Sequence, residues 1–450
     1  MQKQLEDYIR SLGLDAYLVG GAVRDELLGV DSKDADFLVL GVDHDQLRAL
    51  LEPHGRVDDL EVAGQRVGLR LWPRDKEIRQ LARSGIELAP PRRERSTGPG
   101  RHAFEIVVDA SASVEDDLAR RDFTVNAIAR RLADGELVDP YGGQEDLDNR
   151  VLRTVSPRSF EEDPLRLVRG LRLVSQLDLA PDDETLRQML DEAGDVKLVS
   201  GERIGGGLQA DGMGELSKLL LGARPAKALR LARDTGVLVA VIPEFAPVIA
   251  FDTQSERQGA TLDEHIFAVV QCAPRALPVR LAALLHDLGK PGSGGQIEKH
   301  AAIGARIADD VLTRLRYPTR LRRYVVELVA AHAFQPDDVD ELYARRFLRE
   351  HGDELARDLV EHKEADLRAK NVSDAELVNV ARLRALLEQE SSSPHRLADL
   401  AIDGSDLLGL GYREGPDLGK TLSSLLDEVV EDPGRNRRDW LLKRAKEQLS

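Results

Sequence analysis

The chain has 450 residues, of which 42% are hydrophobic and only 4% aromatic, and a formal net charge of −17. A chain of this length exceeds one ordinary core, so we expect roughly two to four domains. The negative charge argues against a protein that wraps duplex DNA, although local basic patches can still bind RNA. The sequence has no apolar run of membrane-spanning length, no signal peptide in MQKQLEDYIR and one cysteine, Cys272, so we expect a cytoplasmic protein without membrane partners.

The N-terminal part alternates short apolar runs with helix-like segments. The pattern predicts strands at 16–19, 36–42, 67–72, 86–89 and 104–108 and helices at 22–28 and 45–51. The segment PPRRERSTGPG, residues 90–100, has turn and charge composition and is expected to be a mobile loop. From Val114 onward hydrophobic residues recur with the helical period of about 3.6, so helices should dominate the remainder.

The segment LVGGAVRDELLGVDSKDADFLVLG joins a glycine turn to a pair of aspartates. At the turn, the backbone N–H groups of Gly20 and Gly21 can approach a phosphate, and Arg24 can reach the same anion. Asp34 and Asp36 are two residues apart, so we expect both on one strand face, where paired carboxylates can hold two Mg²⁺ ions. A plain turn and a solvated loop are the alternatives for the separate pieces, but their order and spacing favour binding of a nucleoside triphosphate.

With this motif the chain resembles the class II tRNA nucleotidyltransferase and bacterial poly(A) polymerase family, of the polymerase-β-like superfamily. The resemblance implies an α+β fold, with a small head containing a mixed sheet at residues 1–145. It also implies a helical neck for nucleobase and RNA recognition at 146–255, an HD domain at 256–390 and a tRNA-binding helical tail at 395–450. Asp34 and Asp36 would hold the catalytic Mg²⁺, with Glu87 as the candidate third carboxylate. The alternative for Glu87 is an ordinary exposed strand residue.

A second motif, EDDLARRDFTVNAIA, resembles the family segment that contacts the ribose and the triphosphate. Arginine suits phosphate, and Asp or Asn suits a hydroxyl. The alternative is a charged helix start that Asp122 caps. The matching residues are Arg120, Arg121, Asp122 and Asn126.

A third motif, FEEDPLRLVRGLRLVSQL, contains Asp163 and Arg166, three residues apart on a predicted helix. Such a pair shares a helix face and offers both acceptors and donors to a base edge. In the family this pair reads cytosine and adenine in place of a nucleic-acid template, and Glu162 completes the motif. We also expect Arg169 to bind the nucleotide. A surface ion pair is the alternative for Asp163 and Arg166.

Two segments bear on the product and on the neck. The loop RRERSTGPG resembles the flexible loop implicated in the change from C to A addition, which argues against the relatives that add only CC. Family members continue from ERI directly into a helix with EL-x-KLL, whereas this chain inserts glycine-rich residues between Gly205 and Gly214. Three consecutive glycines weaken a helix by about 1 kcal/mol each relative to alanine. We therefore expect a break in the neck.

Downstream, histidines and aspartates recur in the order of HD-domain metal ligands. Imidazole and carboxylate groups bind a divalent transition metal, and an adjacent His-Asp pair can bridge two ions that activate water. His300 and His332 are further candidates, and helix packing is the alternative role for the histidines. The positions that match the HD order are His265, His286, Asp287 and Asp366.

The segment from Leu397 onward resembles the family's C-terminal module, which implies binding of the tRNA elbow. A packing module with a solvated basic end is the alternative. The matching residues are Gly404, Asp406, Leu407, Gly411, Gly415, Pro416 and Gly419.

The leading hypothesis is addition of CCA to tRNA 3′ ends from CTP and ATP, with pyrophosphate release and a possible accessory HD phosphohydrolase. A bacterial poly(A) polymerase and an enzyme that adds only CC or only A share the same motifs and stay open. From other classes, the alternatives are an HD phosphohydrolase with a vestigial transferase head and a nonenzymatic RNA-binding protein.

Overall fold

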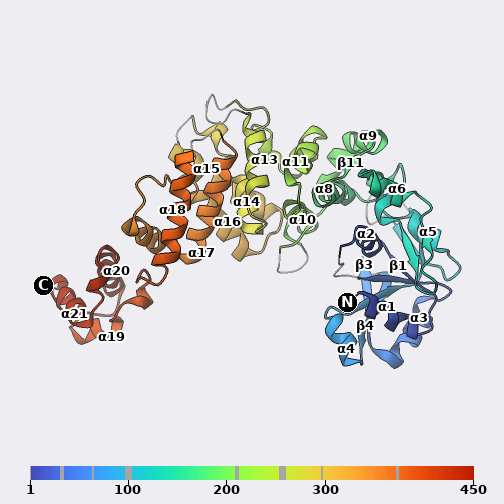
Figure 1. Ribbon diagram of the computed structural model, residues 1–450, viewed down its shortest axis with the longest axis horizontal. Helices are drawn as coiled ribbons and strands as arrows, with labels where there is room; N and C mark the ends of the chain where they lie inside the picture. Colours follow the sequence, from blue (N-terminus) through green and yellow to red (C-terminus); the bar gives the residue numbers. More distant parts are fainter. Residues whose placement is uncertain are drawn as a thin grey trace. The chain divides into compact units, whose positions relative to one another are not determined.

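The structure is a computed structural model, and it describes residues 2–30, 35–62, 65–96, 104–207, 212–252, 260–294, 297–370 and 374–449 (Figure 1). The chain divides into two compact units, Met1–Ile204 with Gly214–Pro243 and Gly205–Met213 with Glu244–Ser450. No helix within the described ranges is both long and apolar enough to cross a membrane. The finer division into four domains stays a prediction.

A seven-stranded mixed sheet, in the order β3-β4-β5-β2-β1-β8-β9, forms the centre of the first unit. β2 and β5 run parallel, and the other neighbouring strands run antiparallel. This arrangement confirms the predicted α+β head with a mixed sheet. The strands are β1 (Ala16–Val19), β2 (Asp36–Val39), β3 (Gly55–Val62), β4 (Gln65–Pro73), β5 (Ile86–Ala89), β8 (Ala129–Arg131) and β9 (Leu137–Val138).

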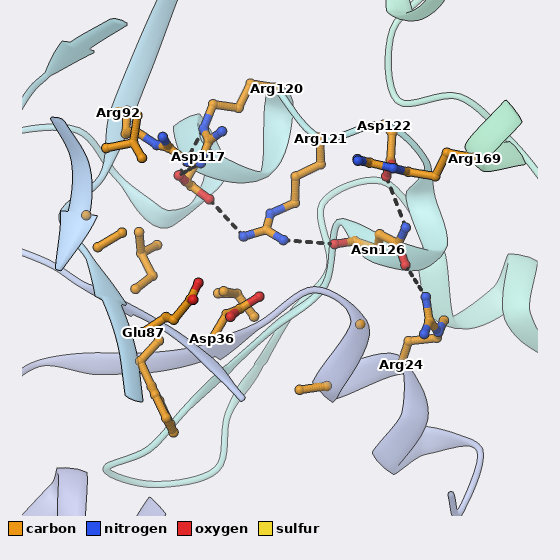
Figure 2. Close-up of a pocket in the computed structure, with 18 of the residues that line it drawn as sticks. Arg24, Asp36, Glu87, Arg92, Asp117, Arg120, Arg121, Asp122, Asn126 and Arg169 are labelled. Atoms are coloured by element: carbon orange, nitrogen blue, oxygen red, sulfur yellow. Dashed lines mark hydrogen bonds and ion pairs between the residues drawn. The ribbon is translucent and has the colours of Figure 1, made fainter. Parts of the chain in front are cut away.

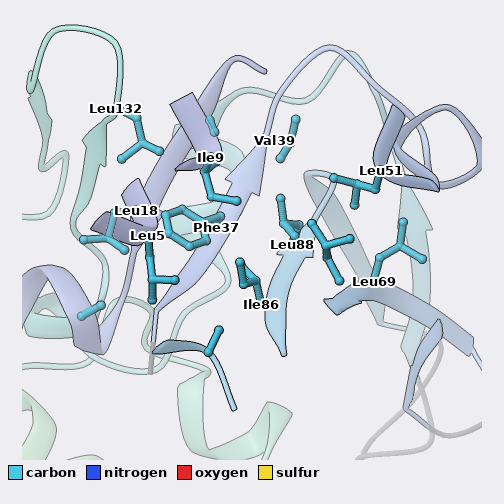
Figure 3. Close-up of a cluster of buried hydrophobic side chains, with 14 of the residues drawn as sticks. Leu5, Ile9, Leu18, Phe37, Val39, Leu51, Leu69, Ile86, Leu88 and Leu132 are labelled. Carbon is cyan, nitrogen blue, oxygen red and sulfur yellow. The ribbon is translucent and has the colours of Figure 1, made fainter. Parts of the chain in front are cut away.

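The main core of this unit lies on one face of the sheet (Figure 3). There Leu18, Phe37 and Leu88 are buried and pack with apolar side chains of α1 (Gln2–Ser11) and α3 (His44–Leu51). Because successive strand residues point to opposite faces, Asp36 and Glu87 belong to the other face. The alternation therefore places apolar residues in the core and leaves the carboxylates on the face away from it.

A separate two-stranded antiparallel sheet pairs β6 (Arg92–Ser96) with β7 (Phe104–Val108). The strand predicted at 104–108 is confirmed, but the predicted loop at 90–100 is wrong for residues 92–96. The sequence RRERS has no alternation of apolar and polar residues, so its periodicity does not indicate a strand. Its strand pairs with β7 outside the main sheet. Residues 97–100 lie outside the described ranges.

Short helices and one further strand pair complete the first unit. β10 (Val151–Leu152) pairs in parallel with β11 (Ala180–Pro181). The helical segments are α2 (Gly21–Leu27), α4 (Lys76–Leu81), α5 (Val114–Ala119), η2 (Thr124–Asn126), α6 (Gly143–Asp148), α7 (Ser159–Glu162), α8 (Leu165–Leu177), α9 (Asp183–Glu192), η3 (Ala193–Leu198), η4 (Glu202–Gly206), α10 (Glu215–Leu220), α11 (Pro225–Asp234) and α12 (Val237–Val241).

The expectation that Asp163 and Arg166 share one helix is wrong. Asp163 ends α7 with an extended backbone, φ −144° and ψ 100°, and Arg166 lies in α8. Proline disfavours the helical conformation in the residue that precedes it, and Pro164 follows Asp163 directly. Instead, the Asp163 carboxylate accepts a hydrogen bond from the backbone N–H of Leu165 at 3.2 Å.

The second unit is helical throughout its described residues, as predicted. Its last part has its own core, in which Leu407, Leu425 and Leu441 are buried. The helical segments are η5 (Pro243–Phe245), α13 (Leu262–Cys272), α14 (Leu277–Leu285), η6 (Lys290–Gly292), α15 (Ile297–Arg314), α16 (Thr319–Ala331), α17 (Glu341–Arg368), α18 (Asp374–Glu390), η7 (Leu397–Asp399), α19 (Gly404–Gly409), α20 (Pro416–Glu431), η8 (Pro433–Arg435) and α21 (Arg438–Leu449).

Gly206, a described residue of the glycine-rich insertion, packs closely against a turn of its own unit, the second one. The backbone N–H of Gly206 donates to the carbonyl oxygen of Leu315 at 2.9 Å. A Cβ atom on Gly206 would lie 2.0 Å from the carbonyl oxygen of Arg316, so only glycine permits this approach. η4 includes Gly205 and Gly206, so the expected break does not fall at these two residues, and Gly207, with φ 69°, follows the end of η4.

Candidate active site

Two carboxylates face one side of the sheet in the first unit. The parallel register of β2 and β5 pairs Asp36 with Glu87, and Figure 2 shows both carboxylates in one cavity. Glu87 also accepts a hydrogen bond from Arg70. β2 begins at Asp36, and Asp34 lies outside the described residues, so the predicted pairing of Asp34 with Asp36 stays a prediction.

The predicted glycine turn precedes α2 and lies beside an arginine of the second motif. Gly20 has φ 71° and ψ −134°, and its carbonyl oxygen accepts from the N–H of Val23 at 3.1 Å. A Cβ atom on Gly20 would lie 2.5 Å from Nη1 of Arg121. The backbone conformation therefore requires glycine here, and a Cβ atom would in addition displace the guanidinium of Arg121.

A buried carboxylate that our sequence analysis missed orients the two motif arginines. Asp117 of α5 accepts from Nε of Arg120 at 3.0 Å and from Nη2 of Arg121 at 3.1 Å. Burial alone would raise the pKa of Asp117, but the two guanidinium groups outweigh it and lower the pKa below its ordinary value. The spacing of three and four residues on a helix was the sequence signal for this pairing.

The residues of the first and second motifs form one hydrogen-bonded chain (Figure 2). Arg24 donates to Oδ1 of Asn126 at 2.6 Å, and Nδ2 of Asn126 donates to Asp122 at 3.0 Å. Arg169 donates to the other oxygen of Asp122 at 3.2 Å. Burial raises the pKa of Asp122, but the charge of Arg169 and the hydrogen bond from Asn126 lower it by more. The pKa is therefore below its ordinary value, and the carboxylate stays charged.

Asp163 and Arg166 have separate partners. Arg166 is buried and donates to the carbonyl oxygens of Ser159 at 3.2 Å and Arg120 at 2.8 Å. Asp163 accepts from Nη2 of Arg203 at 2.9 Å, and this pairing outweighs burial and lowers the pKa of Asp163. Arg203 is a partner that the sequence analysis did not assign.

Arg166 and residues of the first two motifs line a cavity of about 630 Å³, whereas Asp163 and Arg203 are not among its described lining residues. That volume is in the range of small-ligand sites, and the many guanidinium groups suit a polyanion. Two further residues that we had not predicted, Arg172 and Glu215, pair at 3.3 Å in its wall. The charged lining residues include Arg24, Asp36, Glu87, Asp117, Arg120, Arg121, Asp122, Arg166, Arg169, Arg172, Glu215 and Lys218.

The second unit contains a buried cluster of histidines and aspartates. Nε2 of His265 lies 3.1 Å from Asp366, and Nε2 of His286 lies 3.1 Å from Asp287. The donor atoms fall into two groups that share Asp287, so its carboxylate stands between two potential ion positions. The groups are His265, His286 and Asp287, and Asp287, His300 and His332.

Hydrogen bonds to the backbone fix the orientation of two of these imidazoles. His286 and His332 each follow the end of a helix, and their Nδ1 atoms lie 2.9 Å and 2.7 Å from the carbonyl oxygens of Ala283 and Val329. A carbonyl oxygen can only accept, so Nδ1 carries the proton. In the neutral ring Nε2 then carries the lone pair that can bind a metal.

The protonation states of the cluster also suit a cation. Burial lowers the pKa of His300 to about 4 and lowers that of His286, so both rings are neutral at physiological pH. Lys290 pairs with Asp287 at 2.7 Å, and Lys370 pairs with Asp366 at 2.6 Å. The neutral imidazoles and charged carboxylates fit a divalent ion, as the HD order predicted.

The tail arginines already pair with aspartates. Arg438 donates to Asp406 at 2.8 Å, and Arg437 donates to Asp439 at 3.1 Å. Binding of a tRNA elbow by this module therefore stays a prediction.

Three domain families match the sequence. The poly A polymerase head domain matches residues 16–153, and the HD domain matches residues 262–375. The probable RNA and SrmB-binding site of polymerase A matches residues 178–249. The mixed sheet, its carboxylates and the arginine-lined cavity thus belong to a nucleotidyltransferase that also carries an HD domain.

Curated relatives narrow this class. The chain is 33% identical over 430 residues to the multifunctional CCA protein of Xanthomonas campestris pv. campestris (strain B100), covering 91% of this chain and 96% of the relative. It is 37% identical over 328 residues to the multifunctional CCA protein of Azoarcus sp. (strain BH72), covering 70% and 73%. The chain belongs to the multifunctional CCA protein family.

Solved structures agree on the fold. The CCA-adding enzyme of Bacillus stearothermophilus, solved with CTP, superimposes with a TM-score of 0.69 at 24% identity, covering 98% of this chain and 96% of that one. The CCA-adding enzyme of Thermotoga maritima, solved with tRNA, gives a TM-score of 0.57 at 20% identity, covering 98% and 93%. These structures confirm the predicted fold, and the curated relatives confirm the predicted family.

Proposed function

We propose that this enzyme adds C, C and A in turn to the 3′ end of tRNA, with CTP and ATP as substrates and pyrophosphate as the leaving product. The observation that carries the proposal is the register of Asp36 with Glu87 at the edge of an arginine-lined cavity. Carboxylates on one side and guanidinium groups on the other match a metal-bound triphosphate. Family membership specifies the tRNA end as the acceptor, and we expect no binding to duplex DNA and a cytoplasmic location.

Asp36 is the proposed Mg²⁺ ligand, with Asp34 and Glu87 as its partners. The paired strand positions of Asp36 and Glu87 fit a divalent ion because two carboxylates share one face. When bound, Mg²⁺ favours deprotonation of the RNA 3′-hydroxyl and neutralises phosphate charge. The 3′-oxygen attacks the α-phosphorus as the bond to pyrophosphate breaks.

The neighbouring motif binds the nucleotide in this proposal. Asp117 holds Arg120 and Arg121 so that both guanidinium groups can donate to phosphate oxygens. Asp122 and Asn126, fixed by their mutual hydrogen bond, can recognise the ribose hydroxyls.

Base selection is assigned to Asp163 and Arg166. Arg203 fixes the carboxylate of Asp163, and two backbone carbonyls fix the guanidinium of Arg166. Groups held in this way keep one pattern of donors and acceptors, which is what selection between cytosine and adenine needs without a template.

The test is incubation of the purified enzyme with tRNA that lacks its last three nucleotides, plus Mg²⁺ and CTP, ATP or both, with sequencing of the products. We expect two C residues with CTP alone and CCA with both. Long A tails would identify a poly(A) polymerase instead, and arrest after CC or addition of A alone would identify a partial enzyme. Asp36→Asn should retain the fold and lose incorporation; substantial incorporation by Asp36→Asn would contradict its role.

A second function, metal-dependent phosphohydrolysis, is favoured by the buried histidine and aspartate cluster. We propose that His265, His286, Asp287 and Asp366 bind a divalent transition metal that activates water for attack on a phosphate ester. Release of phosphate from nucleotides or RNA ends with Ni²⁺, Co²⁺ or Mn²⁺ tests this. No release with any of these ions would leave the cluster a structural element.

A further inference from the structure

His362 is a buried histidine that the HD order of ligands does not include. It lies in α17 four residues before Asp366, so both side chains project from the same helix face. Only 1% of His362 is exposed. Its ring therefore points into the interior of the unit, on the side that holds the metal-binding cluster.

The ring of His362 is surrounded by imidazoles of that cluster. Its centroid lies 5.0 Å from the ring of His286 and 5.8 Å from the ring of His332, both edge to face. Within the described part of the chain, neither of its ring nitrogens has a hydrogen-bond partner. His286 and His332, by contrast, each have a backbone carbonyl close to Nδ1.

An unpaired buried nitrogen has a cost that packing alone does not justify. Leaving one buried polar atom unsatisfied costs about 1–3 kcal/mol, whereas an apolar residue of similar size would fill the same space without it. The neighbouring Oδ1 of Asp366 and Nε2 of His286 also lack hydrogen bonds of good geometry. Several unsatisfied donor atoms that converge on one place indicate a position at which a cation can bind.

We infer that His362 is an additional ligand of this metal centre, binding one of its ions through a ring nitrogen from the side of His286 and His332. The inference rests on the proposed metal centre and extends its ligand set. The chemical class of the ligand is a divalent transition metal, because imidazole nitrogens prefer such ions to Mg²⁺.

Binding of Co²⁺ to the full-length protein tests the inference without an activity assay. His362→Phe and His362→Ala both remove the ring nitrogens. Phenylalanine keeps an aromatic ring at this position, whereas alanine leaves the volume of the ring empty. We expect the parent to take up two ions by elemental analysis. In both variants one ion should bind at least ~100-fold more weakly, more than is typical when a residue only orients ligands. The visible Co²⁺ spectrum should change as the coordination number falls.

His351→Phe is the matched control, since His351 lies in α17 on the other side of a kink at Gly352 and its ring centroid lies 4.5 Å from that of Phe347. It should bind both ions as the parent does. Unchanged ion affinities and spectra in both His362 variants, with a parent that binds two ions, would overturn this inference alone. A parent that binds no divalent ion would overturn the proposed metal centre as well. Circular dichroism of the metal-free variants checks that they are folded.

Discussion

Replacing Gly20 by alanine tests whether the glycine turn positions Arg121. A non-glycine residue at φ 71° and ψ −134° is strained by about 1–3 kcal/mol. The new Cβ atom would also lie 2.5 Å from Nη1 of Arg121, so the guanidinium must shift, and we expect the shift to weaken its 3.1 Å hydrogen bond to Asp117. Weakening that charged hydrogen bond adds about 1–2 kcal/mol, which gives about 3 kcal/mol in total.

For a unit of this size, about 3 kcal/mol corresponds to a fall in Tm of about 6–12 °C by calorimetry. CTP incorporation should fall at least about tenfold, since each 1.4 kcal/mol of lost positioning energy is about tenfold in rate. Gly29→Ala is the matched control: Gly29 also has positive φ, 69°, but nothing lies within 4 Å of its added Cβ. It should lower Tm by about 2–4 °C and leave incorporation unchanged. Equal effects of the two substitutions on incorporation would refute the reasoning.

Three further predictions concern pH, base selection and the independence of the two sites. Burial, and then the charge of Asp195, raise the pKa of Glu192 to about 7 from 4.5. The protonated form therefore stabilises the fold at low pH, and this contribution is lost as the pH rises through about 7. In urea unfolding, the free energy of unfolding of Glu192→Gln should match that of the parent near pH 4 and exceed it by about 1–2 kcal/mol at pH 8, after allowance for solvent screening. A difference in this free energy that stays constant with pH would contradict the prediction. Asp163→Ala should reduce the preference between CTP and ATP in competition assays, because it frees Arg203; an unchanged ratio would count against the assignment. Asp287→Asn should end phosphate release and leave CCA addition within about twofold, and parallel loss of both activities would show that the sites are coupled.

Much of the fold could be predicted from the sequence because hydrophobic periodicity reports burial. β1, β5 and β7 match predicted strands, and α3 contains the predicted helix at 45–51. β3 was missed because it is an edge strand with charged residues, and β6 was missed because it is a polar strand outside the main sheet. Periodicity detects a strand only where one of its faces enters a core.

The site was predictable as a set of residue types but not as a set of contacts. The motifs brought Arg24, Asp122 and Asn126 to attention, and the structure joins them by hydrogen bonds. Asp117 and His362 were missed because burial decides their roles, and a helix sequence does not distinguish a buried carboxylate or imidazole from an exposed one. Asp163 and Arg166 have different partners because Pro164 keeps the backbone of Asp163 extended. This effect of proline on the preceding residue outweighs the helical spacing of the two residues.

The in-register parallel pairing of β2 with β5 has a consequence for how the enzyme matures. Parallel neighbours cannot be joined by a tight turn, and the chain that connects β2 to β5 contains the hairpin of β3 and β4, so Asp36 and Glu87 meet only through pairing of strands that are distant in the sequence. A slip of one residue would put buried Ile86 or Leu88 where the carboxylate belongs. In the proposed mechanism, a head with a misregistered sheet would therefore lack the paired carboxylates that hold the metal.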